Sequence, residues 1–312
     1  MATFNGAKYL ADQLDSLLGQ THRPHELVVC DDCSSDRTPE IVLSFAREAP
    51  FPVHLHRNTV RLGASENFLQ AAKLCRGEWI SFCDQDDVWL PAKLQTLTEA
   101  IGRSPGVLMA CHRAMVVDDD LKCTGRVIGV HTGVAEKLLQ SPYHTWRCAY
   151  GFTQTFRREL TNELPTQSRA FEPHDQWTFL LACAIGQVLL LPDVLALYRR
   201  HENNVSVLPH ETEVLNRLPT RGIHDHFGSA AVAMKRMEVY LTREAPQRSK
   251  AVALYRSLHR ALRARAAIND PASDWITRTL TWSSGLIGGS YIGRGRLGFR
   301  ALMADAARVV RK

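Results

Sequence analysis

Short apolar runs alternate with amphipathic segments from residue 1 to residue 83, and this order restricts the possible folds more than any other feature. Expected strands lie at about 1–4, 26–30, 51–56 and 79–83, and expected helices at about 7–18, 38–46 and 65–75. A strand–helix order of this kind predicts an α/β fold, with a parallel sheet covered by helices on both faces.

Polar residues follow each of the expected strands. They are Asn5, the pair Asp31 and Asp32, Arg61, and the run from Asp84 to Asp86. Ligands of parallel α/β sheets bind beyond the carboxyl ends of the strands. We therefore expect these side chains to converge on one edge of the sheet.

The densest group of polar residues is an acidic cluster, Asp84, Asp86 and Asp87, which follows the apolar run 79–83. An extended chain places residues i and i+2 on one face, so Asp84 and Asp86 should point the same way. Two neighbouring carboxylates repel unless a cation lies between them, and their oxygen atoms suit Mg²⁺ or Mn²⁺. A solvated turn is the simpler alternative, with Asp87 as a helix cap. Trp89 favours a packed turn.

Composition and charge narrow the function classes without selecting one. The 312 residues suffice for one large or two modest domains, and 45% hydrophobic with 22% charged residues is ordinary for a globular protein. The net charge of +6 and the isoelectric point of about 9.0 fit anionic substrates, nucleic acid or an anionic membrane surface. A nucleic-acid binder is disfavoured, because the basic residues are spread and not interleaved with aromatic ones on one face.

Cysteine usage and hydropathy favour a cytoplasmic protein. The 8 cysteines are scattered along the chain and no signal peptide is expected, which favours a reducing compartment. Cys30 and Cys33 form a CxxC pair, but no second cysteine pair follows at the spacing of a zinc site. The most apolar window, 179–197, is interrupted at Gly186 and Pro192, so it predicts a buried helix followed by strand structure instead of a membrane span. Two short strands are expected there, at 188–191 and 195–198.

The character of the chain changes near residue 208. The segment 225–268 has helical spacing with many Arg and Lys, and 283–312 begins Gly-rich and continues as a basic helix. We expect a first domain over 1–207, with a nucleotide-binding half of about 1–112 and an acceptor half of about 113–207. A basic helical region over 208–312 follows. It either contacts an anionic membrane peripherally or packs as a solvated helix.

Five motifs in this order resemble those of family 2 glycosyltransferases, which have the GT-A fold. Segments 1–10, 28–36 and 84–91 carry the likeness to the family, and 174–177 and 198–204 look like the later motifs of its bacterial rhamnosyltransferase-like branch. The resemblance spans about 1–205. Two departures are the missing apolar strand half before residue 1 and Cys33 in place of a common Gly. A Cβ at Cys33 disfavours positive φ, so a different turn is expected there.

The resemblance implies an inverting, metal-dependent transfer of a sugar from a nucleoside-diphosphate sugar. The acceptor would be a hydroxyl of a growing cell-surface glycan or of a lipid-linked acceptor. The resemblance favours deoxythymidine-diphosphate rhamnose as the donor. Mg²⁺ or Mn²⁺ would neutralise the leaving diphosphate, with Asp86 as the first ligand. Asp84 would be the second, directly or through water or a ribose hydroxyl.

The family pattern also implies a base pocket. Ala2 and Phe4 would line it, Phe4 by stacking. Asp32 would accept a hydrogen bond from a pyrimidine N3–H, and Arg61 would lie over the base or near the phosphates. The alternatives are a core aromatic for Phe4 and a surface charge for Arg61.

Inversion requires a base opposite the leaving group, and Asp175 is the candidate. Its simpler alternative is a helix N-cap. Arg199 and His201 would reach the diphosphate or metal from a closing loop. Trp177 would stack on a sugar or pack in the core.

Two other classes stay open. A metal-dependent nucleotidyltransferase also places acidic residues on an α/β sheet, but it normally opens with a Gly-rich phosphate loop that is missing here. A catalytically inactive nucleotide- or carbohydrate-binding protein would not need Asp84, Asp86 and Asp175 together.

Overall fold

A computed structural model describes residues 1–129, 137–139, 150–163, 173–202, 204, 220–268 and 270. The chain forms two compact units, 1–207 and 208–312. The Gly-rich and basic segment expected at 283–312 lies outside the described residues.

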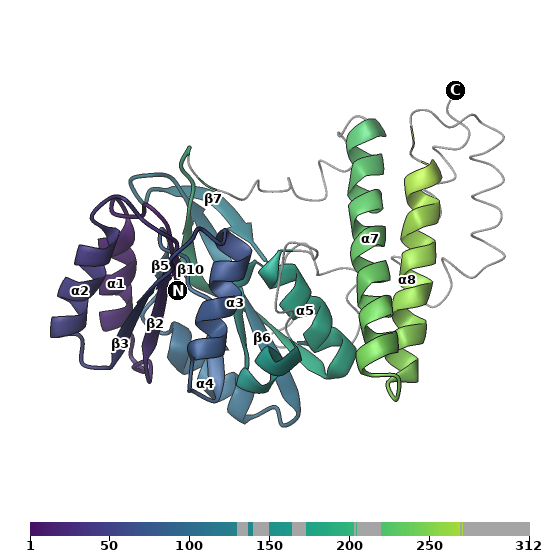
Figure 1. Cartoon of the computed structure of the whole chain (residues 1–312), viewed down its shortest axis with the longest axis horizontal. Coiled ribbons are helices and arrows are strands. Elements are labelled where there is room, and N and C mark those ends of the chain that lie inside the picture. The colour runs from purple at the N-terminus through teal and green to yellow at the C-terminus, as the bar shows by residue number, and fades with distance from the viewer. Residues whose placement is uncertain are drawn as a thin grey trace. The chain divides into compact units, whose positions relative to one another are not determined.

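A three-stranded parallel sheet begins the first unit. Its order is β1 (Ala2–Thr3), β2 (Leu27–Asp31) and β3 (Val53–Arg57). The helices α1 (Leu10–Leu18) and α2 (Thr38–Glu48) pack together on one side of it, and α3 (Ala64–Leu74) contacts β1 and β2 from the other (Figure 1). The mixed α/β fold class is confirmed, with helices on both faces of the parallel strands.

A larger mixed sheet follows, in the order β4-β9-β6-β10-β5, with β7 on β6 and β8 on β10. Only β6 and β10 pair in parallel among its described strands. The strands are β4 (Trp79–Ser81), β5 (Val88–Trp89), β6 (Val107–Val117), β7 (Cys123–Ile128), β8 (Lys137–Leu139), β9 (Gln154–Arg157) and β10 (Gln187–Arg199).

Two expectations about strands were wrong. β4 ends at Ser81 and pairs antiparallel with β9, so it does not extend the first sheet to Asp84. The two short strands expected within residues 188–198 form the single strand β10, which continues past Pro192 with shifts in its register against β6.

The remaining elements of the first unit pack on the mixed sheet. They are α4 (Lys93–Gly102), α5 (His174–Ile185) and the 3₁₀ turns η2 (Gly151–Thr153) and η3 (Arg158–Glu163). Leu97 and Ala100 of α4 join Val107 and Leu189 in one apolar cluster. The apolar window 179–197 forms the buried part of α5 and then β10, as the sequence predicts.

In the second unit, α7 (Thr220–Glu244) packs on α8 (Ser249–Ile268). Buried apolar side chains at helical spacing form the contact, including Met234, Met237, Tyr255 and Leu258. Within the part of the chain that the structure describes, the helices lack the length or the apolar content that a bilayer crossing requires.

Candidate active site

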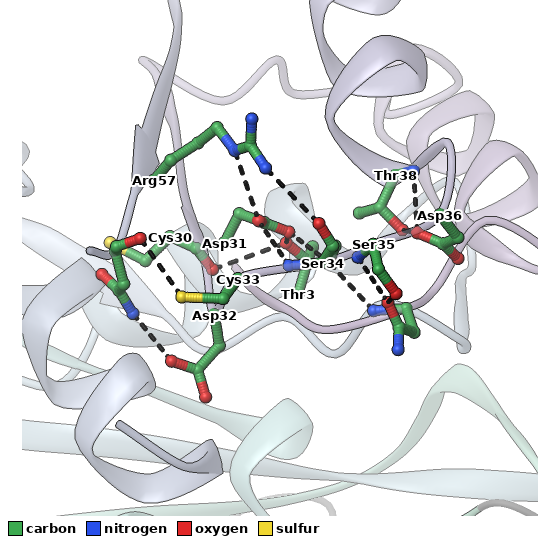
Figure 2. A network of polar contacts seen from close by, with 12 residues as sticks. Thr3, Cys30, Asp31, Asp32, Cys33, Ser34, Ser35, Asp36, Thr38 and Arg57 are labelled. Atoms are coloured by element: carbon green, nitrogen blue, oxygen red, sulfur yellow. Dashed lines mark hydrogen bonds and ion pairs between the residues drawn. The ribbon is translucent and has the colours of Figure 1, made fainter. Parts of the chain in front are cut away.

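Asp31 organises the loop that follows β2, as Figure 2 shows. Its fully buried carboxylate accepts hydrogen bonds from Thr3 Oγ1 at 3.0 Å, Ser34 N at 3.0 Å and Ser34 Oγ at 2.5 Å. Arg57 Nε lies 3.7 Å from the same carboxylate. Asp31 therefore fixes the ends of β1 and β2 against each other, and its oxygen atoms are used within the protein.

A second carboxylate, Asp36, ties this loop to the start of α1. It accepts hydrogen bonds from Ala7 N at 3.0 Å and Thr38 Oγ1 at 2.6 Å, and Thr38 Oγ1 accepts Gly6 N at 2.8 Å. Burial raises the pKa of Asp36, but these hydrogen bonds, led by those from Thr38, outweigh it and leave the pKa below its usual range.

Cys33 adopts the positive φ that its Cβ was expected to disfavour. Its φ is 64°, and its Sγ donates to Asn58 O at 3.2 Å. The turn therefore keeps the left-handed conformation that suits glycine, and the expectation of a different turn was wrong.

Asp32 points away from the Asp31 network (Figure 2). Its carboxylate is buried and accepts hydrogen bonds from Asn58 Nδ2 at 2.9 Å, Leu62 N at 2.7 Å and Gly63 N at 2.8 Å. It therefore holds the loop that carries Arg61. Two of these bonds fall on Oδ1 and one on Oδ2, so one acceptor position remains for a ligand donor.

Phe4 lies next to that loop and to the acidic cluster. Arg61 stacks on its ring, with Cζ 3.7 Å from the ring centroid. Gln85 Oε1 accepts Phe4 N at 2.9 Å, and Gln85 Nε2 donates to Phe4 O at 3.1 Å. An incoming base that stacks on this face of Phe4 must displace or sandwich the guanidinium of Arg61. Ala2 is buried in β1, where it pairs with Cys30.

Gln85 places Phe4 beside Asp84 and Asp86. Burial raises the pKa of Asp84 to about 8, with Asp86 and then Asp175 as further causes. Asp86 and Asp175 are thus close enough to Asp84 to oppose its ionisation. The chain bends at Gln85 and Asp86, so an extended strand does not account for their proximity.

Asp86 is also held by the segment after β10. His201 Nε2 lies 2.9 Å from Asp86 Oδ2, and Asn204 Nδ2 donates to the same oxygen at 3.3 Å. The His201 ring packs on Tyr9, with 4.5 Å between centroids. His201 thus lies at the predicted metal ligand, and its role in binding stays a prediction.

Asp87 and Arg199 form a buried structural contact. Asp87 Oδ1 accepts the Arg199 backbone N–H at 3.1 Å, and burial raises the pKa of Asp87 well above its usual range, with Asp86 and Asp84 adding to the effect. The Arg199 guanidinium, 3% exposed, donates to Asp86 O, Asp119 O and Asp12 Oδ2. Arg199 therefore braces the acidic loop, and its predicted contact with the diphosphate or metal stays a prediction.

Asp175 lies in the first turn of α5 and is partly exposed. Its Oδ2 accepts Gly151 N at 3.1 Å and its Oδ1 accepts Gln176 N at 2.7 Å, while Gln154 Nε2 donates to Asp175 O at 2.9 Å. Pro173 is the N-cap residue, so the simple capping role does not apply.

Trp177, two residues further along α5, is 1% exposed. A side chain this deeply buried packs in the core, which is the second of the two roles that the sequence allows.

The cluster fits a divalent cation in part. No group of three or more His, Cys, Asp and Glu side chains is arranged as a metal site among the described residues. Mg²⁺ is commonly held by one or two carboxylates, with water and substrate phosphates completing the shell. Asp84 and Asp86 meet that requirement. Burial, followed by the nearby Asp86 and Asp175, raises the pKa of Asp84, and a bound cation would favour its ionised form.

Sequence reasoning missed several residues that hold the site. Gln85 fixes Phe4, and a Cβ on the neighbouring Gly6 would lie 2.2 Å from Gln85 Oε1, so a larger residue there would displace the Gln85 side chain. Asn67 is buried, donates to Cys30 O at 2.7 Å and accepts from Asn58 Nδ2 at 3.0 Å. A polar residue inside an otherwise amphipathic helix is a weak signal, since it is also typical of a solvated face.

Comparison with known proteins gives a family. Residues 1–164 match the family model described as "Glycosyl transferase family 2". An uncharacterized protein of Mycobacterium tuberculosis is 26% identical over 218 residues, which cover 65% of this chain and 58% of the relative. The matched stretch thus spans little more than half the length of that relative.

A second relative has a specific name. It is the UDP-Glc:alpha-D-GlcNAc-diphosphoundecaprenol beta-1,3-glucosyltransferase WfgD of Escherichia coli, 36% identical over 95 residues, or 30% of this chain and 36% of the relative. Among solved structures, S. aureus TarS 1–349 in complex with UDP-GlcNAc has a TM-score of 0.58 at 18% identity, covering 98% of this chain and 88% of TarS. This likeness supports the GT-A fold.

Proposed function

Since the chain belongs to glycosyl transferase family 2, we propose that it transfers a sugar from a nucleoside-diphosphate sugar to a hydroxyl group, with inversion at the anomeric carbon. The acceptor would be a growing cell-surface glycan or a lipid-linked acceptor. The named E. coli relative uses UDP-Glc and a diphosphoundecaprenol-linked sugar. It therefore supports a nucleoside-diphosphate sugar as the donor and a lipid-linked sugar as the acceptor.

The observation that carries the proposal is the gathering of three carboxylates beside an aromatic ring. Asp84 lies near both Asp86 and Asp175, since each raises its pKa, and Gln85 holds Phe4 next to them. Segments distant in sequence thus supply a base-stacking ring, two candidate cation ligands and a separate carboxylate.

These groups have distinct roles in the proposed reaction. Phe4 and Arg61 would hold the nucleobase, with Ala2 beside them and Asp32 offering its remaining acceptor position. Asp84 and Asp86 would hold Mg²⁺ or Mn²⁺ against the diphosphate, and His201 would position Asp86. The bound cation would neutralise charge that develops on the leaving diphosphate.

Asp175 would accept the proton of the acceptor hydroxyl as the new glycosidic bond forms. Its carboxylate is oriented by backbone N–H groups of Gly151 and Gln176, so it has a fixed direction before substrate arrives. Preorganisation of this kind lowers the barrier by reducing the reorientation needed during reaction.

The test is a donor panel with an Asp175→Asn variant. Deoxythymidine-diphosphate rhamnose, UDP-Glc and UDP-GlcNAc would be assayed for transfer to a diphosphoundecaprenol-linked sugar with Mn²⁺. We expect Asp175→Asn to lower kcat by about 10²–10⁴-fold, the usual contribution of a positioned base, with little change in donor KM.

Asp193→Asn is the matched control, because Asp193 is an exposed residue of β10. Full activity in Asp175→Asn would refute the role of Asp175. Nucleotidyl transfer in place of sugar transfer would refute the reaction class.

The basic second unit suggests where the acceptor would be met. α8 contains five Lys and Arg residues and no Asp or Glu. We propose peripheral contact between this unit and an anionic membrane, which would bring the first unit to lipid-linked acceptors.

A further inference from the structure

Lys93 is a buried cation that the proposed reaction does not use. It is the first residue of α4 and has no exposed surface, although lysine is rarely buried in proteins. Its Nζ donates to Phe152 O at 2.8 Å and lies 3.5 Å from the centroid of the Trp89 ring. A buried ammonium group with fixed partners on two other elements acts as a connector.

Lys93 lies close to the acidic loop, residues 84–87, because the Trp89 ring that its Nζ contacts belongs to β5, which directly follows that loop. Burial lowers the pKa of Lys93 to about 7, against the opposing influence of Cys83, Asp87 and Asp84. Among the described residues, Asp87 Oδ2 is buried and makes no hydrogen bond. The protonated form of Lys93 would therefore favour the ionised forms of Asp84 and Asp87.

The Lys93 contact with Phe152 also connects Lys93 to Asp175. Phe152 belongs to η2, and the preceding residue, Gly151, donates its N–H to Asp175 Oδ2. η2 and α5 are tightly packed here, because a Cβ on Gly151 would lie 2.9 Å from His174 Nε2 and 3.3 Å from Asp175 Cβ. A shift of η2 by a few tenths of an ångström would change the Asp175 contact.

We propose that Lys93 is a positioning residue, which holds η2 against the acidic loop so that Gly151 orients the Asp175 carboxylate. It touches neither donor nor acceptor. This inference rests on the proposed function, in which Asp175 is the base. It connects the two halves of the site, since one amino group contacts both Phe152 of η2 and Trp89, two residues after the acidic loop.

The first test uses NMR and needs no knowledge of the donor sugar. The hydrogen bond to a carboxylate should move the Gly151 amide proton downfield. In Lys93→Met, which removes the charge but keeps an unbranched side chain, we expect this resonance to move upfield, towards its position in Asp175→Asn. Lys122→Met, at a side chain that is 75% exposed, should leave it unchanged.

The second test separates binding from turnover. With UDP and Mn²⁺ as the probe, Lys93→Met should keep the affinity within about 3-fold, while kcat for the donor selected from the panel falls about 10²-fold, the effect of a small misplacement. In an Asp175→Asn background, Lys93→Met should lower kcat little further, because the two residues act through one contact.

If Lys93→Met does not fold, Lys93→Gln replaces it, because it also removes the charge from an unbranched side chain, and it should give the same kcat loss and the same non-additivity. An unchanged Gly151 resonance in folded Lys93→Met, or a full additional loss in the Asp175→Asn background, would overturn the inference. Undiminished turnover in Asp175→Asn alone would instead overturn the proposed function, so the two failures are distinguishable.

Discussion

At the scale of single residues, the backbone of Cys33 is strained, in the turn that follows β2 beside the proposed base pocket. Its φ of 64° lies in the left-handed region, which costs an L-residue with a Cβ roughly 1–2 kcal/mol. The neighbouring bonds of Asp31 and Asp32 fix the loop on both sides, so the conformation is imposed by its surroundings. The strain is held next to the proposed base pocket.

Cys33→Gly should therefore stabilise the first unit. Glycine relieves the strain, but its larger unfolded-state entropy and the loss of the Sγ contact to Asn58 offset part of the gain, which leaves about 0.5 kcal/mol. Chemical denaturation of the two proteins checks this. Asn5→Gly is the comparison, because Asn5 also has positive φ but its Oδ1 accepts Ser35 N, so no net gain is expected there. A destabilised Cys33→Gly would contradict this account of the turn.

Site residues could be predicted only where the local sequence, and not the tertiary contacts of the side chain, indicates the role. The sequence places Phe4, Asp84, Asp86 and Asp175 in polar or strand-end segments, and the structure brings them together. It could not separate Arg199 from a phosphate-binding arginine, because both uses need a charged group near the acidic loop. In the structure its guanidinium donates to three backbone and side-chain acceptors, which depend on tertiary contacts that the sequence does not reveal.

At the scale of elements, the order of strands and helices predicts the parallel half well and the mixed sheet poorly. Periodicity identifies β2, β3 and the helices α1 to α3. It does not reveal the partner of a three-residue strand such as β4, which pairs with β9, from a segment far along the chain. Short strands contribute few ladder bonds, so packing decides their pairing.

The start of α5 contains a buried histidine that should make stability depend on pH. The His174 ring stacks on Phe68 with 4.1 Å between centroids, and neither ring nitrogen has a hydrogen-bond partner among the described residues. Burial lowers the pKa of His174, although Asp175 acts in the opposite direction. The unfolded chain thus binds this proton more readily than the folded chain.

The free energy of unfolding should therefore fall as the pH drops below about 6.5, the unfolded value for histidine. His174→Phe keeps an aromatic ring at this place and removes the titrating group, so its stability should decline less between pH 7.5 and pH 5. Denaturant titrations at both pH values measure this, with the exposed His22→Phe as control. An equal decline in His174→Phe and the parent protein would show that His174 does not titrate as described.

At the scale of the whole molecule, the chain consists of two compact units with different interiors. The helix pair of the second unit contains a buried acidic residue, Glu238 of α7, which is 5% exposed. Arg256 Nε donates to Glu238 Oε1 at 2.7 Å and Lys235 Nζ to Oε2 at 3.0 Å. Burial raises the pKa of Glu238, but the hydrogen bonds from Arg256 and Lys235 outweigh this and leave it lowered.

Glu238→Gln should weaken the second unit and spare the first. Its partners are about half exposed, so solvent screens the ion pairs, and we expect a loss of about 1–2 kcal/mol. Calorimetry of the full chain should show a lower Tm in one transition, while the affinity for UDP with Mn²⁺ stays unchanged. The exposed Glu244→Gln on the same helix is the matched control. A changed nucleotide affinity in Glu238→Gln would mean that the two units are coupled.

The central claim is that one site brings together a nucleotide, a divalent cation and Asp175. The most direct measurement is an anomalous difference map from crystals of the full chain grown with UDP and Mn²⁺. We predict a manganese peak within coordination distance of Asp84 or Asp86, diphosphate oxygens on the same ion, and the uracil ring against Phe4. A manganese ion or uracil bound away from these residues, or an Asp175 carboxylate that faces away from the diphosphate, would contradict the account.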